Sequence, residues 1–310
     1  MPASCRVKKT RGHVTPGPPR MQGRGYLETR ALLAYSSPIP LTLPPTAMSR
    51  FRLLSACSLL AFLLPTLSSF AQEAPLSADR PGFGDGSAVM APGRVQIEGG
   101  YGYSEDGPVV FHALGQALVR IGVLPRVELR LGLNSFLIWD VADRSRSGFE
   151  DTMIGAKVGL LDGDGVPMGR PSLTLIVLTS LPTGDDRLSA DVLQPEAKLA
   201  TDWPLTDVLG LSVNAGVASV ATGADGREAQ YTLTLSLGAG LPSVPGLGVY
   251  AGYRLQALPG LDTSRHDLEG GATYLLNPNT QLDVNFGVNL HPAGTDAFFV
   301  GLGVARRLGR

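Results

Sequence analysis

The chain has 310 residues, of which 44% are hydrophobic and 17% are charged, and its formal net charge is −1. The charged fraction lies below the ~25% of ordinary globular proteins. Residues 72–310 carry 17 basic against 26 acidic residues, a balance of −9, so this part lacks the clustered positive charge that nucleic-acid binding requires.

The first element in chain order is an export leader at residues 48–71. Two arginines precede an apolar run from Leu53 to Leu64, and small residues lie three and one positions before a cleavage point between Ala71 and Gln72. This pattern predicts a signal peptide, because the run is too short for a membrane anchor. A lipoprotein cleavage box ending at Cys57 is the alternative, but most of the apolar run follows that cysteine.

Residues 1–47 precede this leader and are basic and rich in proline, with no periodicity. We interpret them as an over-extended start, with Met48 as the first residue; a translated extension would be disordered. Both cysteines, Cys5 and Cys57, lie before residue 72. The mature chain would then have no thiol, which excludes a disulfide framework, a thiolate metal site and a cysteine nucleophile.

Residues 72–93 are rich in Gly, Pro and Asp, and we expect a periplasmic N-terminal segment there. From residue 94 to residue 308, apolar and polar residues alternate in twelve runs of about 10–13 residues. The runs cover residues 94–103, 111–123, 126–137, 149–161, 171–182, 191–201, 209–220, 230–241, 248–258, 266–276, 280–290 and 297–308. Strands of soluble proteins usually stop near ~5–6 residues, whereas ~9–11 tilted residues cross a bilayer.

The connectors between the runs differ in length. Residues 124–125 and 277–279 are tight, while residues 138–148, 183–191 and 222–228 are longer and polar. An even number of strands with such turns predicts an all-β fold, an up-and-down antiparallel outer-membrane β-barrel of about twelve strands with both ends in the periplasm. A soluble periplasmic β-sandwich is the alternative.

The run at residues 126–137 shows what the alternation implies. Val127, Leu129 and Leu131 fall on one face and would meet lipid, while the charged residues between them would face the lumen. The charged residues on the inner faces of all runs are Arg94, Glu98, Arg120, Arg126, Glu128, Arg130, Asp151, Lys157, Glu196, Lys198, Arg254, Glu269 and Asp283. They would either line a polar pathway for a solute or form cross-strand ion pairs that occlude the lumen.

Sequence motifs give no support for an enzyme. His112, His266 and His291 are the only histidines after residue 71, and no two have the spacing of a metal site. Ser264 lies near His266, but we expect the two side chains on opposite faces of a strand. No G-x-S-x-G elbow or phosphate-binding loop is present. We therefore expect no catalytic residue, no metal and no cofactor; a lipid-modifying enzyme with a Ser/His cluster near one rim is the least favoured alternative.

Five motifs in order resemble one family. They are "DRPGF" (residues 79–83), "PGRVQIEGGYGY" (92–103), "IGAKVGLL" (154–161), "TSLPTGD" (179–185) and "LDVNFGVNL" (282–290). The chain is similar, over residues 79 to about 305, to the outer-membrane β-barrel family named for the meta-cleavage pathway of phenol degradation, whose members are labelled transporters.

The resemblance implies an outer-membrane location, with membrane lipid and the barrel-assembly machinery as partners. It also implies passive transport of a small solute, hydrophobic or aromatic by analogy. The motif Asp79, Arg80, Pro81, Gly82 and Phe83 precedes the first strand and would form a plug or a periplasmic latch. The sequence departs from the pattern of such barrels at its end, "ARRLGR", where an aromatic residue is expected; either Leu308 substitutes for it or the last residues overhang.

Overall fold

The structure is a computed structural model that describes residues 75–141, 144–222, 226–290 and 297–309. The predicted extension (1–47) and signal peptide (48–71), with its cleavage point between Ala71 and Gln72, lie outside these residues. So does His291. No helix in the described ranges is long and apolar enough to cross a membrane.

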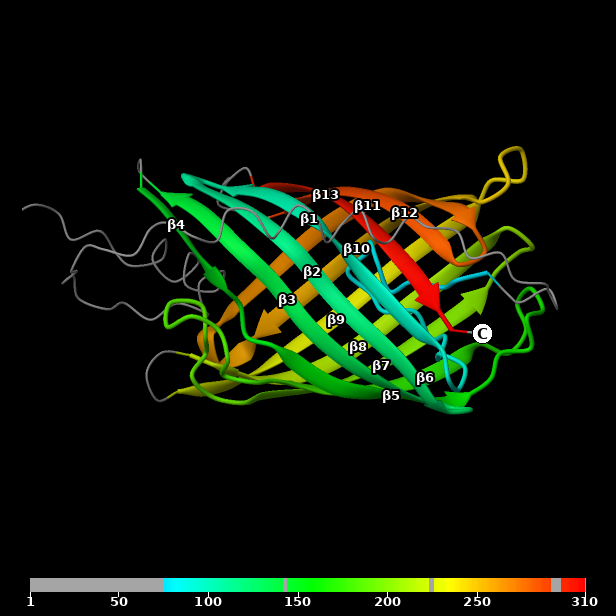
Figure 1. Cartoon of the computed structure of the whole chain (residues 1–310), viewed down its shortest axis with the longest axis horizontal. Coiled ribbons are helices and arrows are strands. Elements are labelled where there is room, and N and C mark those ends of the chain that lie inside the picture. The colour runs from blue at the N-terminus through cyan, green and yellow to red at the C-terminus, as the bar shows by residue number, and fades with distance from the viewer. Residues whose placement is uncertain (1–74, 142–143, 223–225, 291–296, 310) are drawn as a thin grey trace, which may run out of the picture.

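The described chain is almost entirely β-structure (Figure 1). Its strands are β1 (Val95–Asp106), β2 (Val109–Leu124), β3 (Val127–Val141), β4 (Arg144–Phe149), β5 (Met153–Leu161), β6 (Ser172–Ser180), β7 (Gln194–Pro204), β8 (Leu209–Ala221), β9 (Arg227–Gly240), β10 (Leu247–Leu258), β11 (Thr263–Asn277), β12 (Thr280–Asn289) and β13 (Phe298–Leu308). A single 3-10 turn, η2 (Pro259–Leu261), joins β10 to β11.

The strands form a closed antiparallel barrel. Consecutive strands pair along the sheet, β1 pairs with β13, and β2 pairs with β3, which completes the ring. The short strand β4 pairs with the end of β3 and β5 pairs with its beginning, so β4 and β5 are two parts of one strand. The barrel therefore has twelve strands, which confirms the predicted fold class.

The two faces of the wall differ as the alternation predicts. In β3, Leu129, Leu131 and Leu133 are 47%, 38% and 50% exposed on the outside, while Glu128 and Arg130, which alternate with them, are 0% and 5% exposed. Within the described residues every strand pairs with a neighbour on both sides except β4, which pairs with β3 alone, and this pairing satisfies the backbone in lipid. The apolar outer face is the surface that a bilayer solvates.

Substitution of Leu131 by arginine is expected to reduce the free energy of unfolding in vesicles by about 2–4 kcal/mol, because the charge would be placed in hydrocarbon. Leu131→Ala is the matched control, since it shortens the side chain without adding a charge. Folding titrations in urea with lipid vesicles measure both changes. Equal losses for the two variants would contradict a lipid-facing position for Leu131.

Sequence reasoning was wrong about one connector. Residues 138–148 were expected to be a polar loop, but β3 continues to Val141 and β4 returns from Arg144 beside it. The alternation shifts by one residue at Asn134, whose φ is 51°, so that Ser135 is buried although Leu133 is exposed, and Trp139 in the hairpin is 8% exposed. The serines and arginines of β4 hid the pattern, because they make both of its faces polar.

Candidate functional site in the barrel lumen

Residues 75–94 run inside the barrel before β1 begins (cyan in Figure 1). The Leu76 N–H donates to the Pro278 carbonyl at 2.8 Å, and the Gly93 N–H donates to the Gly122 carbonyl at 2.9 Å. We call residues 76–90 the internal segment. The terminal end of the barrel is the one where β1 starts and β13 stops, and the distal end is the opposite one. Hydrogen bonds, ion pairs or ring contacts join this segment to eleven of the twelve strands, β9 being the exception.

Asp79 is the centre of the contacts between segment and wall. Its carboxylate lies 2.6 Å from Arg130 Nη1, 3.0 Å from Lys157 Nζ and 3.5 Å from Arg120 Nη1. Burial alone would raise the pKa of Asp79, but these three cations outweigh it and lower that pKa well below its usual range. Asp79 is therefore an ionised counter-ion for three inward cations, all within the predicted lumen set.

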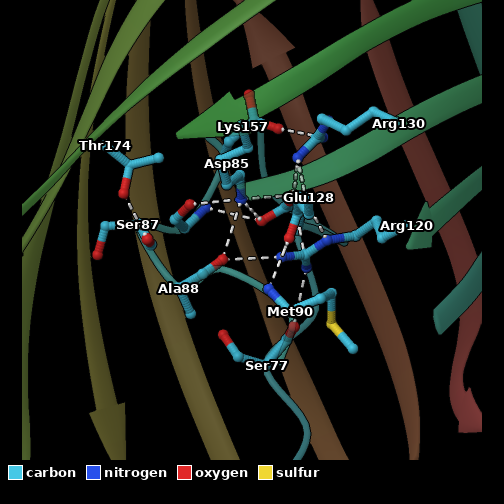
Figure 2. Close-up of polar contacts among 12 residues, drawn as sticks. Ser77, Asp85, Ser87, Ala88, Met90, Arg120, Glu128, Arg130, Lys157 and Thr174 are labelled. Carbon is cyan, nitrogen blue, oxygen red and sulfur yellow. Dashed lines mark hydrogen bonds and ion pairs between the residues drawn. The ribbon is translucent and has the colours of Figure 1, made fainter. Parts of the chain in front are cut away.

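The wall cations also bind the segment's backbone (Figure 2). Arg120 is 1% exposed and pairs with Glu128 through Nε and Nη2, both at 2.9 Å. The second carboxylate oxygen of Glu128 also accepts the Met90 N–H at 2.8 Å. Lys157 donates to the Gly86 carbonyl at 2.8 Å. Arg120 and Glu128 thus have partners both in the wall and in the segment, and Lys157 binds the segment alone through Asp79 and the Gly86 and Ala88 carbonyls.

The middle of the segment makes a second bridge. Asp85 accepts from Arg130 and from Lys198, each at 2.8 Å, and its N–H donates to Asn214 at 2.6 Å. Burial would raise the pKa of Asp85, but Lys198 and Arg130 lower it. Asp85 therefore ties β3, β7 and β8 together across the lumen.

The DRPGF motif reaches the opposite wall. Arg80 donates to Gln116 at 2.8 Å and lies 3.3 Å from Asp283. The Phe83 N–H donates to Glu269 at 2.8 Å, and the guanidinium of Arg254 lies 3.7 Å from the centre of the Phe83 ring, a cation–π contact. The motif supplies one charge and one ring to a wall that provides complementary partners for both.

Glycines in the wall make room for Arg80. A Cβ at Gly100 would lie 2.5 Å from Arg80 Nη2, and a Cβ at Gly303 would lie 2.4 Å from Arg80 Nε. At these two positions the lumenal space beside the wall is filled by the internal segment.

Two cavities lie on either side of the segment. The distal cavity, about 570 Å³, reaches the strand ends around Tyr103 and Phe111, and the terminal cavity, about 530 Å³, reaches Trp203 and the turns near the terminal end. The residues that line both are Asp79, Arg80, Pro81, Gly82 and Asp85. The segment therefore stands between the cavities along the barrel axis.

Four residues of the predicted lumen set lie away from the centre. Arg126 lies in the β2–β3 turn, 53% exposed on its side chain and paired with Asp162. Arg94 lies just before β1 and donates to the Gly309 carbonyl. Asp151 lies between β4 and β5 and binds a loop, as described below. Glu196 contacts Lys198 at 3.2 Å, in the wall itself.

Sequence reasoning missed Asp85, Ser87 and Asn214. Ser87 donates to Asp202 at 2.6 Å and its carbonyl accepts from Thr174 at 2.6 Å. The available signal was the segment "GFGDGSA" (82–88), whose small residues allow the chain to pass close to the wall. Its hydrogen-bond partners in the wall lie 32 to 186 residues away along the chain, so no local pattern connects them.

The expectation about Ser264 and His266 was wrong. Residues two apart on a strand share a face, and Ser264 Oγ lies 3.2 Å from His266 Nε2 on the outer side of β11. The other ring nitrogen, Nδ1, lies 2.7 Å from the Tyr253 hydroxyl, and His112 has the same relation to Tyr101. The described residues hold no group of three His, Cys, Asp or Glu that could bind a metal.

The comparisons with known proteins agree with this architecture. A family model described as "Putative MetA-pathway of phenol degradation" matches residues 78–308, from the internal segment to the end of β13. The chain belongs to this family. No curated protein sequence matches the chain significantly.

Among solved structures, an outer membrane channel from Pseudomonas putida F1 is similar with a TM-score of 0.54 and 14% identity, over 74% of this chain and 100% of that one. The NanC porin is similar with a TM-score of 0.49 and 9% identity, over 69% and 100% of the two chains. The first likeness supports the barrel fold. With its closed ring and apolar exterior, this member of the family is an outer-membrane β-barrel.

Proposed function

We propose that the protein is a passive channel for small solutes across the outer membrane, and that its internal segment closes the axial route. The observation that carries this proposal is the pair of cavities, about 570 and 530 Å³, which the same five residues separate. A twelve-stranded barrel is wider than the ~8-stranded barrels that wall side chains fill alone. Here the wall leaves a lumen, and a short polar segment occupies its middle.

In this proposal the terminal end faces the periplasm and the distal end faces the outside. Membrane lipid is the partner of the outer face, and the barrel-assembly machinery inserts the chain. The binding of oligogalacturonate is a property of the KdgM porin, a barrel that resembles this one. For this chain we propose only small solutes, since each cavity falls within the ~300–1,000 Å³ range of small-molecule sites.

Planar-bilayer conductance and liposome swelling with purified protein test the proposal. Brief openings above the lipid background, and swelling in small sugars or amino acids, are the expected results. A barrel that is folded by heat-modifiable gel mobility but admits no solute and passes no current would contradict it. That result would favour the structural alternative, in which the segment fills the lumen permanently.

The geometry does not favour the enzyme alternative. Ser264, His266 and Tyr253 form a hydrogen-bonded chain, but a general base in acyl transfer works with an orienting partner and donors for the oxyanion. The same Tyr–His arrangement recurs at Tyr101 and His112 without a serine. We propose that both pairs serve as polar aromatic contacts at the lipid interface, where such rings gather in barrels.

A further inference from the structure

The barrel wall has a seam beside β4. Within the described residues β4 pairs with β3 alone, and β6 ends at Ser180, opposite the first residue of β5. Along Arg144–Phe149, the edge of β4 that faces away from β3 therefore has no strand beside it. In Figure 1, β4 extends past the end of β5 toward the distal end of the barrel.

A loop, residues 181–193, covers this seam through a few specific contacts. Asp185 N–H donates to the Phe149 carbonyl at 2.9 Å, and the hydroxyls of Thr152 and Thr183 lie 2.7 Å apart. Asp151 is 1% exposed, and its carboxylate accepts three loop N–H groups, those of Thr183, Gly184 and Ala190, at 2.8 to 3.0 Å. These few contacts thus replace the continuous ladder found between other neighbouring strands. We call the three hydrogen bonds to the Asp151 carboxylate the latch.

The seam separates a cavity from an apolar surface. On the inner side, Ser135, Glu150 and Met153 line the distal cavity. On the outer side, Phe149 and Ile154 are 59% and 44% exposed, and Leu193 in the loop is 52% exposed. Exposed apolar side chains on the outside of a membrane barrel contact lipid. The loop is therefore the barrier between the distal cavity and the bilayer.

The distal cavity meets the internal segment at its other limit, where Asp79 and Asp85 are held by buried cations. We infer that small apolar solutes leave this cavity sideways, through the seam between β4 and β6, when loop 181–193 swings away from Asp151. The inference rests on the proposed channel function and adds a second exit and a solute class. Only an apolar solute enters hydrocarbon readily through such an opening, because transfer into hydrocarbon is costly for polar groups.

A reversible crosslink across the seam tests this inference. Thr152→Cys with Thr183→Cys places two thiols where hydroxyls lie 2.7 Å apart, within reach of a disulfide. The mature chain has no other cysteine, because both natural ones precede residue 72. The protein is reconstituted in vesicles with lipopolysaccharide outside and phospholipid inside, and N-phenyl-1-naphthylamine, which fluoresces in hydrocarbon, is added outside.

In the reduced double variant we expect probe entry at the wild-type rate, and in the oxidised variant entry at the rate of protein-free vesicles, restored by dithiothreitol. Conductance should be the same in both states, and each single-cysteine variant should be insensitive to oxidation. Unchanged probe entry in a crosslinked protein that still conducts would overturn the lateral exit alone. A wild-type protein that speeds neither the probe nor any polar solute would overturn the channel function as well.

Opening the latch gives the opposite prediction. Asp151→Ala removes the acceptor of three backbone N–H groups and should raise the rate of probe entry while leaving conductance unchanged. Asp186→Ala, in the same loop, is the matched control, because that side chain is exposed and makes no hydrogen bond or ion pair with the described residues. A rate in the Asp151 variant that equals wild type would contradict the role of the latch.

Discussion

Deletion of residues 76–88 is expected to change the barrel from a closed to a conducting state. The deletion removes Asp79, Arg80 and Asp85 from the boundary between the two cavities, and water then fills the lumen and hydrates the wall charges. We expect the single-channel conductance to rise about tenfold or more, because a twelve-stranded barrel without a plug is wider than the ~8-stranded type that its own side chains fill.

A smaller change separates the effect of losing the ion pairs of the internal segment from the effect of losing the segment itself. Asp79→Ala with Asp85→Ala keeps the length of the segment but removes the carboxylates that five ion pairs with the wall require. The conductance of this double variant should lie between those of the wild type and the deletion variant, with frequent transitions between closed and open states. Asp207→Ala, in an exposed turn at the terminal end, is the control and should behave as wild type. A deletion variant that folds and stays closed would show that the wall itself blocks the lumen.

Glu128→Ala is expected to reduce the free energy of unfolding by about 3–5 kcal/mol, since removing one partner leaves a buried charge uncompensated. Glu128 is fully buried, and its carboxylate binds Arg120 twice, Arg130 once and the Met90 N–H. Glu128→Gln should cost less, because the amide oxygen can still accept from Met90. Urea unfolding in vesicles, followed by fluorescence of Trp139 and Trp203, measures the loss.

Arg126→Ala is the matched comparison for this network. The sequence assigned Arg126 to the same inner face, but its ion pair with Asp162 is exposed on both sides, at 53% and 68%. Exposed pairs contribute about 0–1 kcal/mol, so this variant should unfold close to wild type. Similar losses for Glu128→Ala and Arg126→Ala would contradict the difference between a lumenal network and a turn.

The wall of this barrel could be predicted from sequence because its signal is local and repeated. Leu129 and Glu128 are neighbours in the chain, and the two-residue period alone places them on opposite faces. The site could be predicted only in part. Arg120, Arg130 and Lys157 could be assigned to the lumen, but not their common partner Asp79, which lies up to 78 residues away and belongs to no periodic element.

The remaining errors have physical causes of the same kind. In the two-residue alternation of its run, Asp151 falls on the inward side. It lies between β4 and β5, however, where the strand is interrupted and the alternation no longer decides which way a side chain points. The interruption leaves no mark in the hydrophobic pattern, since residues 149–161 alternate well enough to look like one run. Only the register of β4 and β5 against β3 reveals it.

The covalent link between the internal segment and β1 has a thermodynamic consequence. A segment tethered at Gly93 and Arg94 behaves as a ligand whose effective concentration is set by the tether, on the order of millimolar for short connections. In the proposed channel, any solute that passes along the axis competes with this built-in ligand, and a weak binder present at micromolar levels cannot displace it by mass action. Each 1.4 kcal/mol removed from the Asp79 and Asp85 contacts changes the open fraction about tenfold. Under the proposed function, the affinity of these fifteen residues for their own barrel therefore sets how easily the channel opens.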